Sequence, residues 1–315
     1  MHIRYAYVGA RIAILFFFLS LGTWTNAQYL PTPDYPDSLN KRRLRAALIT
    51  EGTFFVGGLS FLYANWYADR ERVPFNFYND AAGYNQIDKA GHAFGAYLYS
   101  DWGYRSLRRA GVNKKKALIW GAGLGLYFQT PIEVFDGLYE GWGFSWSDMG
   151  ANALGAGLVL GQEALFEEQL VRMKFSFSRS PYSDRAFGLL GNNYLGNLVN
   201  DYNGHTYWLS TSIHRLAPKP IQANIPKWLN IAAGYGAGGM YGEFENRTFY
   251  RGNRLPTNQE RYRQFYLSLD VDWTQIPTRS RFLRSVFEGL NYIKFPLPGL
   301  EYNTKGEFKG KLVAF

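Results

Sequence analysis

The two halves of the chain distribute their hydrophobic residues differently. Residues 41–173 hold long apolar stretches rich in Gly and Ala, broken by single charged residues, whereas apolar and polar residues begin to alternate from about Lys174. A helix-type pattern followed by a strand-type pattern predicts an α+β protein. We expect a Gly-rich antiparallel helical bundle over residues 41–173 and a β-rich C-terminal region over residues 174–315.

Four helical segments are expected in the first half, and short connections would make neighbouring helices antiparallel. Glycines four residues apart, at Gly121 with Gly125 and at Gly157 with Gly161, would let helix backbones approach closely. The expected helices cover residues 41–69, 88–110, 114–129 with a kink or restart at Pro131 that continues to Tyr139, and 145–173.

The clearest strand pattern covers residues 264–273. Apolar Phe265, Leu267, Leu269, Val271 and Trp273 alternate there with more polar neighbours, which predicts a half-buried strand. Weaker strand patterns cover residues 206–214, 228–235 and 308–315. About five strands are fewer than the eight that the smallest transmembrane barrel needs, so a closed barrel is the minority interpretation. A β-rich half in the outer membrane, with the helical domain in the periplasm, stays open as a third possibility for the function.

Two shorter patterns lie within the β-rich half. An apolar stripe over residues 282–290, flanked by arginines, suits a short surface helix that covers a sheet. The glycine-rich run from Gly234 to Gly239 lacks the Lys-Ser/Thr ending of a phosphate-binding loop, so we interpret it as a turn or a bulged strand.

Residues 1–27 have the layout of a secretory signal peptide. Basic residues precede the apolar run 12–21, and small residues end at Ala27. The apolar run is shorter than the ~20 residues that a membrane span needs. We therefore expect cleavage after Ala27, an extended Pro-containing linker over residues 28–40, and an exported protein.

The composition narrows the range of partners. The chain has no Cys, which excludes disulfides, thiolate chemistry and a lipid-modified Cys. A net charge of +9 with 18% aromatic residues points to an envelope lipid or glycan surface, although a basic surface can also serve solubility alone. We expect no nucleic acid as a partner, because the chain has no nucleic-acid-binding motif. Protein partners cannot be named from the sequence.

Charge placement bears on whether the helices cross a membrane. Glu51, Asp101, Glu133 and Glu163 interrupt the apolar stretches before they reach ~20 residues. Basic clusters over residues 41–45 and 108–116 would lie at one end of the bundle, facing outward against the positive-inside preference. We expect a periplasmic bundle outside the inner membrane, associated with the outer membrane.

Three pairs of polar residues are expected to meet at the opposite end of the bundle. Each pair has helical spacing, so its two side chains lie on one helix face. The alternating helix directions bring the three pairs together. They are Asp88 with His92, Glu133 with Asp136, and Asp148 with Asn152, accompanied by Lys89 and Ser145.

Helix capping is the alternative explanation for three of the acids. Asn85 to Asp88, Thr130 to Glu133 and Ser145 to Asp148 each have the spacing of an N-cap and an acidic third residue. Capping does not explain His92 or Asn152, which lie further inside their helices. A lone His in that position is more often a hydrogen-bonded core residue than a ligand or a base.

The ordered motifs resemble a known family. D-K-x-x-H at Asp88 to His92, E-x-x-D at Glu133 to Asp136, and F-S-x-S-D-x-x-A-N-x-x-G from Phe144 to Gly155 resemble the YfiM-like predicted periplasmic lipoproteins, and more distantly the VanZ-like membrane proteins. The resemblance covers about residues 44–170, and the β-rich half resembles the extension of Bacteroidetes members. It implies a helical domain in the periplasm and no established activity. The missing Cys departs from the lipoprotein pattern.

Two other functions remain open. In the first, a non-enzymatic structural or binding module uses the cluster as a buried hydrogen-bond network. In the second, Asp88, His92, Glu133 and Asp148 bind a divalent metal that hydrolyses an envelope lipid or glycan, with Glu133 as general base. The chain has neither an H-E-x-x-H nor a G-x-S-x-G motif. Whether it is an enzyme is therefore undecided, and the cofactor is unknown, with a divalent metal as the candidate.

Overall fold

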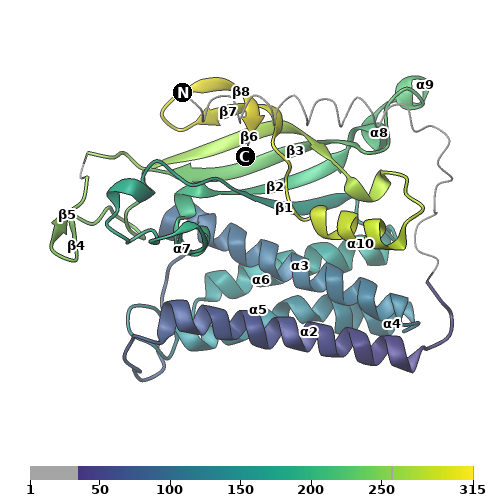
Figure 1. The fold of residues 1–315 in the computed structure, drawn as a ribbon, viewed down its shortest axis with the longest axis horizontal. Helices are drawn as coiled ribbons and strands as arrows, with labels where there is room; N and C mark the ends of the chain where they lie inside the picture. The colour runs from purple at the N-terminus through teal and green to yellow at the C-terminus, as the bar shows by residue number, and fades with distance from the viewer. Residues whose placement is uncertain (1–34, 257, 315) are drawn as a thin grey trace.

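The computed structural model describes residues 35–256 and 258–314. The expected signal peptide, residues 1–27, and the first part of the expected linker lie outside the described residues. The described chain forms a layer of helices and a mostly antiparallel sheet that packs on it (Figure 1). This arrangement confirms the α+β class with helices first and strands second.

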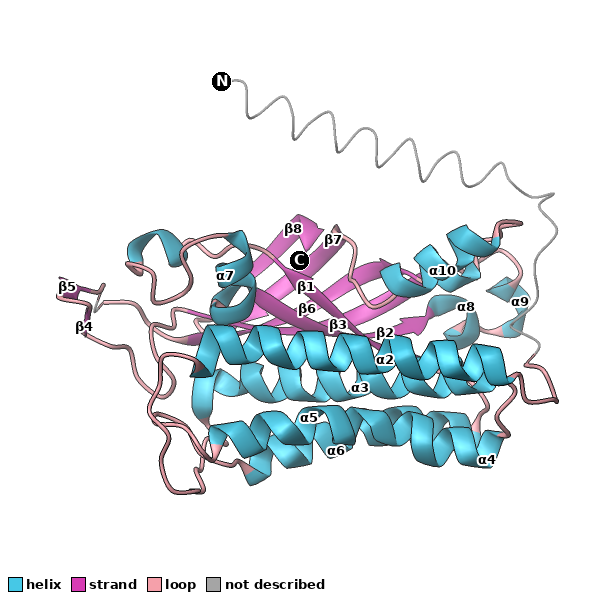
Figure 2. Ribbon diagram, turned by 60° about the horizontal axis from the view of Figure 1, so that its bottom comes forward, coloured by secondary structure: helices cyan, strands magenta, loops and turns pink. Residues whose placement is uncertain are grey.

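The helical layer follows the predicted order, and the long helices run side by side (Figure 2). A π-helical turn, Tyr63–Tyr67, extends α2, and another, Ala117–Gly121, joins α4 to α5. The start of α2 meets the end of α3, where the Asn40 amide donates to the Ala110 carbonyl at 2.8 Å. The helices are α2 Lys41–Leu62, α3 Ile87–Arg109, α4 Lys114–Lys116, α5 Ala122–Asp136 and α6 Trp146–Leu165.

Two expected helix boundaries are wrong. Pro131 lies within α5 and does not restart it, and the helix ends at Asp136. The fourth helix ends at Leu165, eight positions before the expected end. Strand β1 already begins at Val171, whose amide donates to Gln162 Oε1 at 2.7 Å, so the α6 side chain holds the returning chain.

Small residues let the neighbouring helices pack closely against α3. Of the two predicted glycine pairs, only Gly121 with Gly125 makes such a contact. A Cβ on Gly121 or Gly125 would overlap the α3 backbone, at 2.6 Å from Tyr104 Cα and 2.1 Å from the Ala96 carbonyl oxygen. Gly157 and Gly161 have nothing within 4 Å of a built Cβ. The close contact of α6 is made instead by Gly155, where an added Cβ would lie 1.9 Å from the Ala93 carbonyl oxygen.

The main sheet has six antiparallel strands in the order β1-β2-β3-β6-β7-β8. The weaker strand patterns correspond to β2, β3 and β8, and the sequence analysis missed β1 and β7. The glycine-rich run forms the end of strand β3, which stops at Gly238. The last glycine of the run, Gly239, follows the strand and has a positive φ of 77°. The strands are β1 Val171–Phe177, β2 His205–Ser212, β3 Leu229–Gly238, β6 Tyr262–Val271, β7 Leu297–Asn303 and β8 Phe308–Ala314, with a separate hairpin of β4 Phe249–Tyr250 and β5 Asn253–Arg254.

Strand β6 forms where the alternation predicted it, but most of its apolar side chains face outward. Phe265, Leu267 and Leu269 are 42–48% exposed, whereas Ser268 and Asp270 are at most 3% exposed. The predicted half-buried strand is therefore confirmed, and along this part its polar side is the buried one. Alternation identifies a strand, but the neighbouring layer decides which side is buried.

The inward side of the sheet is polar because charged groups there pair with each other. Lys174 of β1 and Asp270 of β6 are both 0% exposed, and their Nζ and Oδ2 atoms lie 2.7 Å apart. The helices cover the other side near β1, β2 and the end of β3, where Phe94 of α3 packs against Phe175 and Tyr207 and Ile87 packs against Ala237. Beyond these strands the apolar side of the sheet meets solvent.

Four shorter helices complete the chain: α7 Tyr194–Asn200, α8 Ile213–Leu216, α9 Lys219–Gln222 and α10 Arg281–Leu290. The last confirms the short helix predicted from the apolar stripe, and its Phe287 ring lies 5.8 Å from that of Trp273.

Helix α2 is the most exposed of the long helices. Glu51 is its single buried residue, while Ile49, Phe54 and Val56 are 61–62% exposed. Among the described residues, the segment Lys41–Tyr67 is the one helix long and apolar enough to cross a membrane by length and composition. Its outer face is an apolar surface without a covering layer.

Candidate metal centre

The helices bring together the polar residues that were expected to meet. Asp88, Lys89 and His92 lie in the first two turns of α3, while Glu133 and Asp136 end α5. Asp148 and Asn152 lie in the first two turns of α6, just after its N-cap Ser145. We call this group, together with Asp80, the His92 centre; its members are Asp80, Asp88, Lys89, His92, Glu133, Asp136, Ser145, Asp148 and Asn152.

His92 lies between carboxylates on both sides of its ring. Nδ1 is 3.3 Å from Glu133 Oε1, and Nε2 is 3.9 Å from both Asp88 Oδ1 and Asp148 Oδ1. The two ring nitrogens thus face different partners. Glu133 is fully buried, whereas the Asp88 and His92 side chains keep 19% and 13% exposure, so the centre opens to solvent on the Asp88 side.

Lys89 joins three carboxylates. Its Nζ is 2.8 Å from Asp80 Oδ2, 3.0 Å from Asp88 Oδ2 and 2.8 Å from Asp148 Oδ1. Burial by itself lowers the pKa of the Lys89 ammonium group. The attraction of the three carboxylates is the larger effect, and it raises this pKa above its usual value. Lys89 therefore stays charged and offsets part of the acidic charge.

The sequence analysis missed Asp80, which lies in the loop before α3. It accepts hydrogen bonds from Ser145 Oγ at 2.6 Å and Ser147 Oγ at 2.7 Å. Burial favours its neutral form, but Lys89 and the two hydroxyl groups lower its pKa to about 2. No helical periodicity marks a loop residue, so this acid had no signal beyond its charge.

Two tyrosines from outside the predicted set also contact the centre. Tyr202, from the C-terminal half, donates to Asp88 Oδ1 at 3.1 Å. Tyr67, at the end of the α2 extension, donates to Asp136 Oδ1 at 2.7 Å. These contacts tie the centre to segments that are distant in sequence.

Capping accounts for one of the three acids. Ser145 caps α6, because the Asp148 amide donates to Ser145 Oγ at 3.1 Å. Asn85 has a left-handed φ of 52° outside α3 and makes no cap, and Thr130 lies inside α5, where its hydroxyl donates to the Leu126 carbonyl. The capping interpretation is therefore wrong for Glu133, whereas Asp88 does lie in the first turn of α3 but has no side-chain cap before it.

Several buried polar atoms of the centre have no hydrogen-bond partner within the described residues. They include His92 Nδ1 and Glu133 Oε1, which face each other without hydrogen-bond geometry. They also include the Oδ1 and Nδ2 atoms of Asn152, whose side chain is fully buried. A buried carboxamide without partners costs free energy. The described side chains thus do not form the mutually satisfied network that a purely structural role needs.

Burial and mutual repulsion change the acidity of the centre. Burial raises the pKa of Glu133 to about 8, that of Asp136 to about 7 and that of Asp148 to about 6. For His92, burial lowers the pKa, but the charges of Asp88, Asp148 and Glu133 outweigh it and raise the pKa to about 9. The centre thus holds more acidic groups than it can keep ionised together.

A metal-ligating geometry exists within the centre. One ligand atom each from Asp88, His92 and Asp148 lie within 4.8 Å of one another. Imidazole and carboxylate donors suit divalent ions such as Zn²⁺ or Mn²⁺. Glu133 lies on the far side of the imidazole from this trio.

A family model matches part of the chain. Residues 76–162 match the family described as predicted periplasmic lipoprotein (DUF2279). The match includes every member of the His92 centre, and it is similarity to an uncharacterised periplasmic family, which fits an exported envelope protein. The narrower likeness to YfiM-like or VanZ-like proteins goes beyond this match. Comparisons with curated proteins and with solved structures find no match.

Proposed function

We propose that this chain is an exported, membrane-associated envelope protein in which the His92 centre binds a divalent cation. In this proposal the protein is a binding module and not an enzyme. The observation that carries the proposal is the placement of one ligand atom each from Asp88, His92 and Asp148 within 4.8 Å of one another, with His92 Nε2 3.9 Å from Oδ1 of either aspartate.

The two sides of the imidazole support this role. A metal-bound His commonly donates its other ring N–H to a carboxylate, which fixes the tautomer. Here Nδ1 faces Glu133 at 3.3 Å and Nε2 faces the two aspartates. The acids that raise the pKa of His92 favour its doubly protonated form, so an ion must displace the proton on Nε2, while Nδ1 keeps its proton toward Glu133.

The charge balance supports a cation as the ligand. The centre holds five carboxylates but only Lys89 and His92 as cationic groups. A divalent ion would offset the remaining repulsion. Lys89 competes for Asp148 Oδ1 at 2.8 Å, so an ion must displace that contact or use the other carboxylate oxygen.

Metal analysis of the purified mature chain tests the proposal. After chelation, titration with Zn²⁺ and Mn²⁺ should bind one equivalent and raise the thermal midpoint, and His92→Ala should lose both effects. His214→Ala is the matched control, because His214 bonds the Ile225 carbonyl in the other half of the chain. No bound ion together with an unchanged midpoint would remove the proposal.

The exposed apolar faces support membrane association. The outer side of α2 and the uncovered side of β6 both expose large apolar residues, including Ile49, Phe54, Phe265 and Leu267. Large exposed apolar patches are typical of membrane or protein contact sites. The expected outer membrane is part of this proposal.

Vesicle flotation tests the association. The wild-type chain should float with vesicles that contain anionic phospholipid, and Ile49→Ser with Phe54→Ser should reduce the floated fraction severalfold. Leu216→Ser with Ile221→Ser is the matched control, because these residues are equally apolar and exposed on α8 and α9. Envelope fractionation on a density gradient then identifies the membrane, and recovery in the soluble periplasm would contradict this part.

A metal-dependent hydrolase is the second candidate. The observation that favours it is the buried Glu133 carboxyl beside His92, whose raised pKa of about 8 suits proton transfer near neutral pH. Against it, the exposure of 13–19% at His92 and Asp88 favours access by an ion and water over access by a lipid or glycan. Metal-dependent turnover of a phosphoester that is lost in Glu133→Gln, with the ion retained, would favour the hydrolase.

A further inference from the structure

A second polar cavity lies at the other end of α3 from the His92 centre. Its volume is about 510 Å³, within the range of small-molecule sites. The last turns of α3, the connection from α6 to β1, the start of β3, the segment after β6 and α10 all line it. Sites between two packed layers are a common place for ligands.

Positive charge predominates in this cavity. Four carboxylates line it, among them Glu163 and Glu288, against a larger number of cationic side chains. The six cationic residues are Arg105, Arg109, Arg172, Arg215, Lys227 and Arg284. The excess favours an anionic ligand, and the carboxylates favour one that also carries hydroxyl groups.

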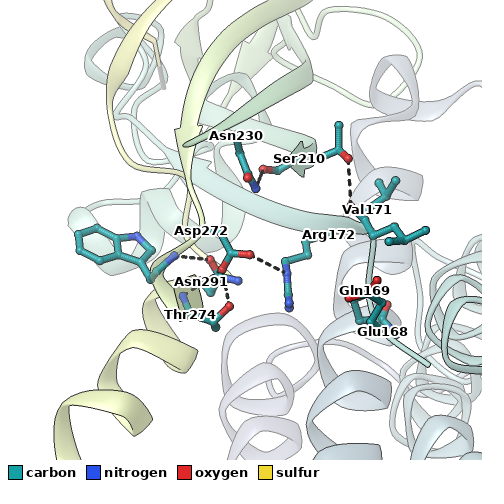
Figure 3. A network of polar contacts seen from close by, with 12 residues as sticks. Glu168, Gln169, Val171, Arg172, Ser210, Asn230, Asp272, Thr274 and Asn291 are labelled. Carbon is teal, nitrogen blue, oxygen red and sulfur yellow. Dashed lines mark hydrogen bonds and ion pairs between the residues drawn. The ribbon is translucent and has the colours of Figure 1, made fainter. Parts of the chain in front are cut away.

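Arg172 is positioned but only partly engaged. Its Nε lies 3.6 Å from Asp272 Oδ2, and Figure 3 shows its terminal nitrogens extending past that carboxylate. Asp272 is itself held by the Thr274 amide at 2.9 Å. A guanidinium group has five N–H donors, so Arg172 keeps donors for a ligand oxyanion.

Two buried polar atoms of the lining have no partner within the described residues. They are Asn230 Oδ1 and Trp273 Nε1, in residues 2% and 4% exposed. The Ser210 hydroxyl gives its single proton to Asp270 Oδ2 at 2.6 Å, so Asn230 must donate to Ser210 through Nδ2 at 3.0 Å (Figure 3). The amide orientation follows from this chain of bonds and leaves Oδ1 as an acceptor.

We propose that this cavity binds a phosphorylated sugar or polyol, either free or as a lipid head group. Arg172 binds the phosphate, since a planar guanidinium group matches its oxygens, and Arg105, whose Nε donates to Asp101 Oδ1 at 2.8 Å, has its terminal nitrogens for a second oxygen. Asn230 Oδ1 accepts a hydrogen bond from a hydroxyl group, as does Glu288 through the oxygen that Arg109 does not contact, and the indole N–H of Trp273 donates to an oxygen. The site is separate from the His92 centre and does not depend on the cation proposed there.

Calorimetric titration of the purified mature chain tests this site with glucose 1-phosphate and dihexanoyl phosphatidylglycerol as probes. At least one probe should bind in the millimolar range or tighter, and glucose should bind much more weakly. Arg172→Gln should weaken binding roughly tenfold, as expected for loss of a charge-assisted contact. Arg254→Gln in the exposed β5 hairpin is the matched control and should bind like the wild type.

Arg284→Gln is the second variant, because Arg172→Gln also removes the partner of Asp272 and can lower stability. Binding of glucose 1-phosphate supports a free ligand, and binding of the lipid alone supports a head group. The proposal is overturned if neither probe binds, if glucose binds as tightly as its phosphate, or if both folded variants bind like the wild type. His92→Ala should leave this binding unchanged.

Discussion

The buried charges under the sheet and those of the His92 centre differ in the number of cationic groups that each carboxylate has beside it. Under the sheet, Lys174 pairs with one acid, Asp270, at 2.7 Å, and its Nζ also donates to the Val271 carbonyl at 2.7 Å. Both side chains are 0% exposed. In the His92 centre, five carboxylates share two cationic residues and the Asp88 side remains open to solvent.

The difference separates a structural ion pair from a candidate binding centre. Lys174 and Lys294 both act on Asp270, so this group has no excess of acids and needs no further cation, although Asp270 Oδ1 also lacks a hydrogen bond. An excess of acids, with buried atoms that lack hydrogen bonds, is stable only if something offsets the repulsion: a proton, Lys89 or a bound cation. The comparison therefore predicts that added cations stabilise one group and not the other.

The largest effect is expected when the structural pair is broken. Lys174→Met leaves Asp270 as an uncompensated buried charge, so the free energy of unfolding should fall by about 4 kcal/mol in urea titrations. Lys174→Met with Asp270→Leu should recover part of the loss, because the uncompensated Asp270 is then gone, while the buried Lys294 loses the acid that raises its pKa. Lys309→Met, at an exposed position on β8, serves as the control. A loss below about 1 kcal/mol in the single variant would contradict the structural assignment.

Removal of Lys89 tests the other side of the comparison. Lys89→Met should lower the free energy of unfolding by about 3 kcal/mol, because three carboxylates lose their shared cation. Millimolar Mn²⁺ or Zn²⁺ should restore much of this loss, whereas Lys174→Met should show no recovery. If the ions restored the free energy of unfolding of Lys89→Met and Lys174→Met equally, the His92 centre would not be distinguished from the structural ion pair by cation binding.

His205, in the C-terminal half, should make the stability of the protein depend on pH. His205 is 6% exposed, and its Nε2 lies 2.8 Å from the Leu198 carbonyl oxygen. Burial lowers its pKa to about 4, so the unfolded chain binds the additional proton between pH 4 and about 6.5.

Stability from the neutral His205 is therefore complete above about pH 6.5 and is lost as the pH falls through 4. The loss between pH 7 and 5 should be about 2 kcal/mol. Denaturant titrations at the two pH values measure it, and His205→Gln should remove this component. An identical pH dependence in wild type and variant would contradict the assignment of a buried neutral ring.

The smallest effects concern the glycines of α6. Gly157→Ala should raise the free energy of unfolding by up to about 1 kcal/mol, because Ala favours helix and nothing lies within 4 Å of the new Cβ. Gly155→Ala should lower it and weaken cation binding, because its Cβ would push α6 away from Ala93 on α3. Equal effects of the two substitutions would show that the spacing of α3 and α6 does not control the centre.

Much of the fold could be predicted from local pattern. The helix segments, four of the strands and the short helix near the C-terminus follow from periodicity, because each depends on residues a few positions apart. Asp88, His92, Glu133, Asp136, Asp148 and Asn152 could also be placed at one end of the bundle, since alternating helix directions follow from short connections.

The partners of these residues could not be predicted in the same way. Asp80 lies in a loop and Tyr202 in the other half of the chain, so no spacing relates either of them to the helical motif. The second cavity combines segments from residue 35 to residue 288 and has no continuous signature in the sequence.

The sequence by itself determined the order of helices and strands and the chemistry available to each helix face, because those properties arise from short-range spacing. The tertiary structure alone decided which side of β6 is buried, since Ser268 and Asp270 face a polar interior and Phe265 and Leu267 do not. It also decided which acids share Lys89. Burial and charge pairing depend on the layers that pack against a residue, and those layers come from distant parts of the chain.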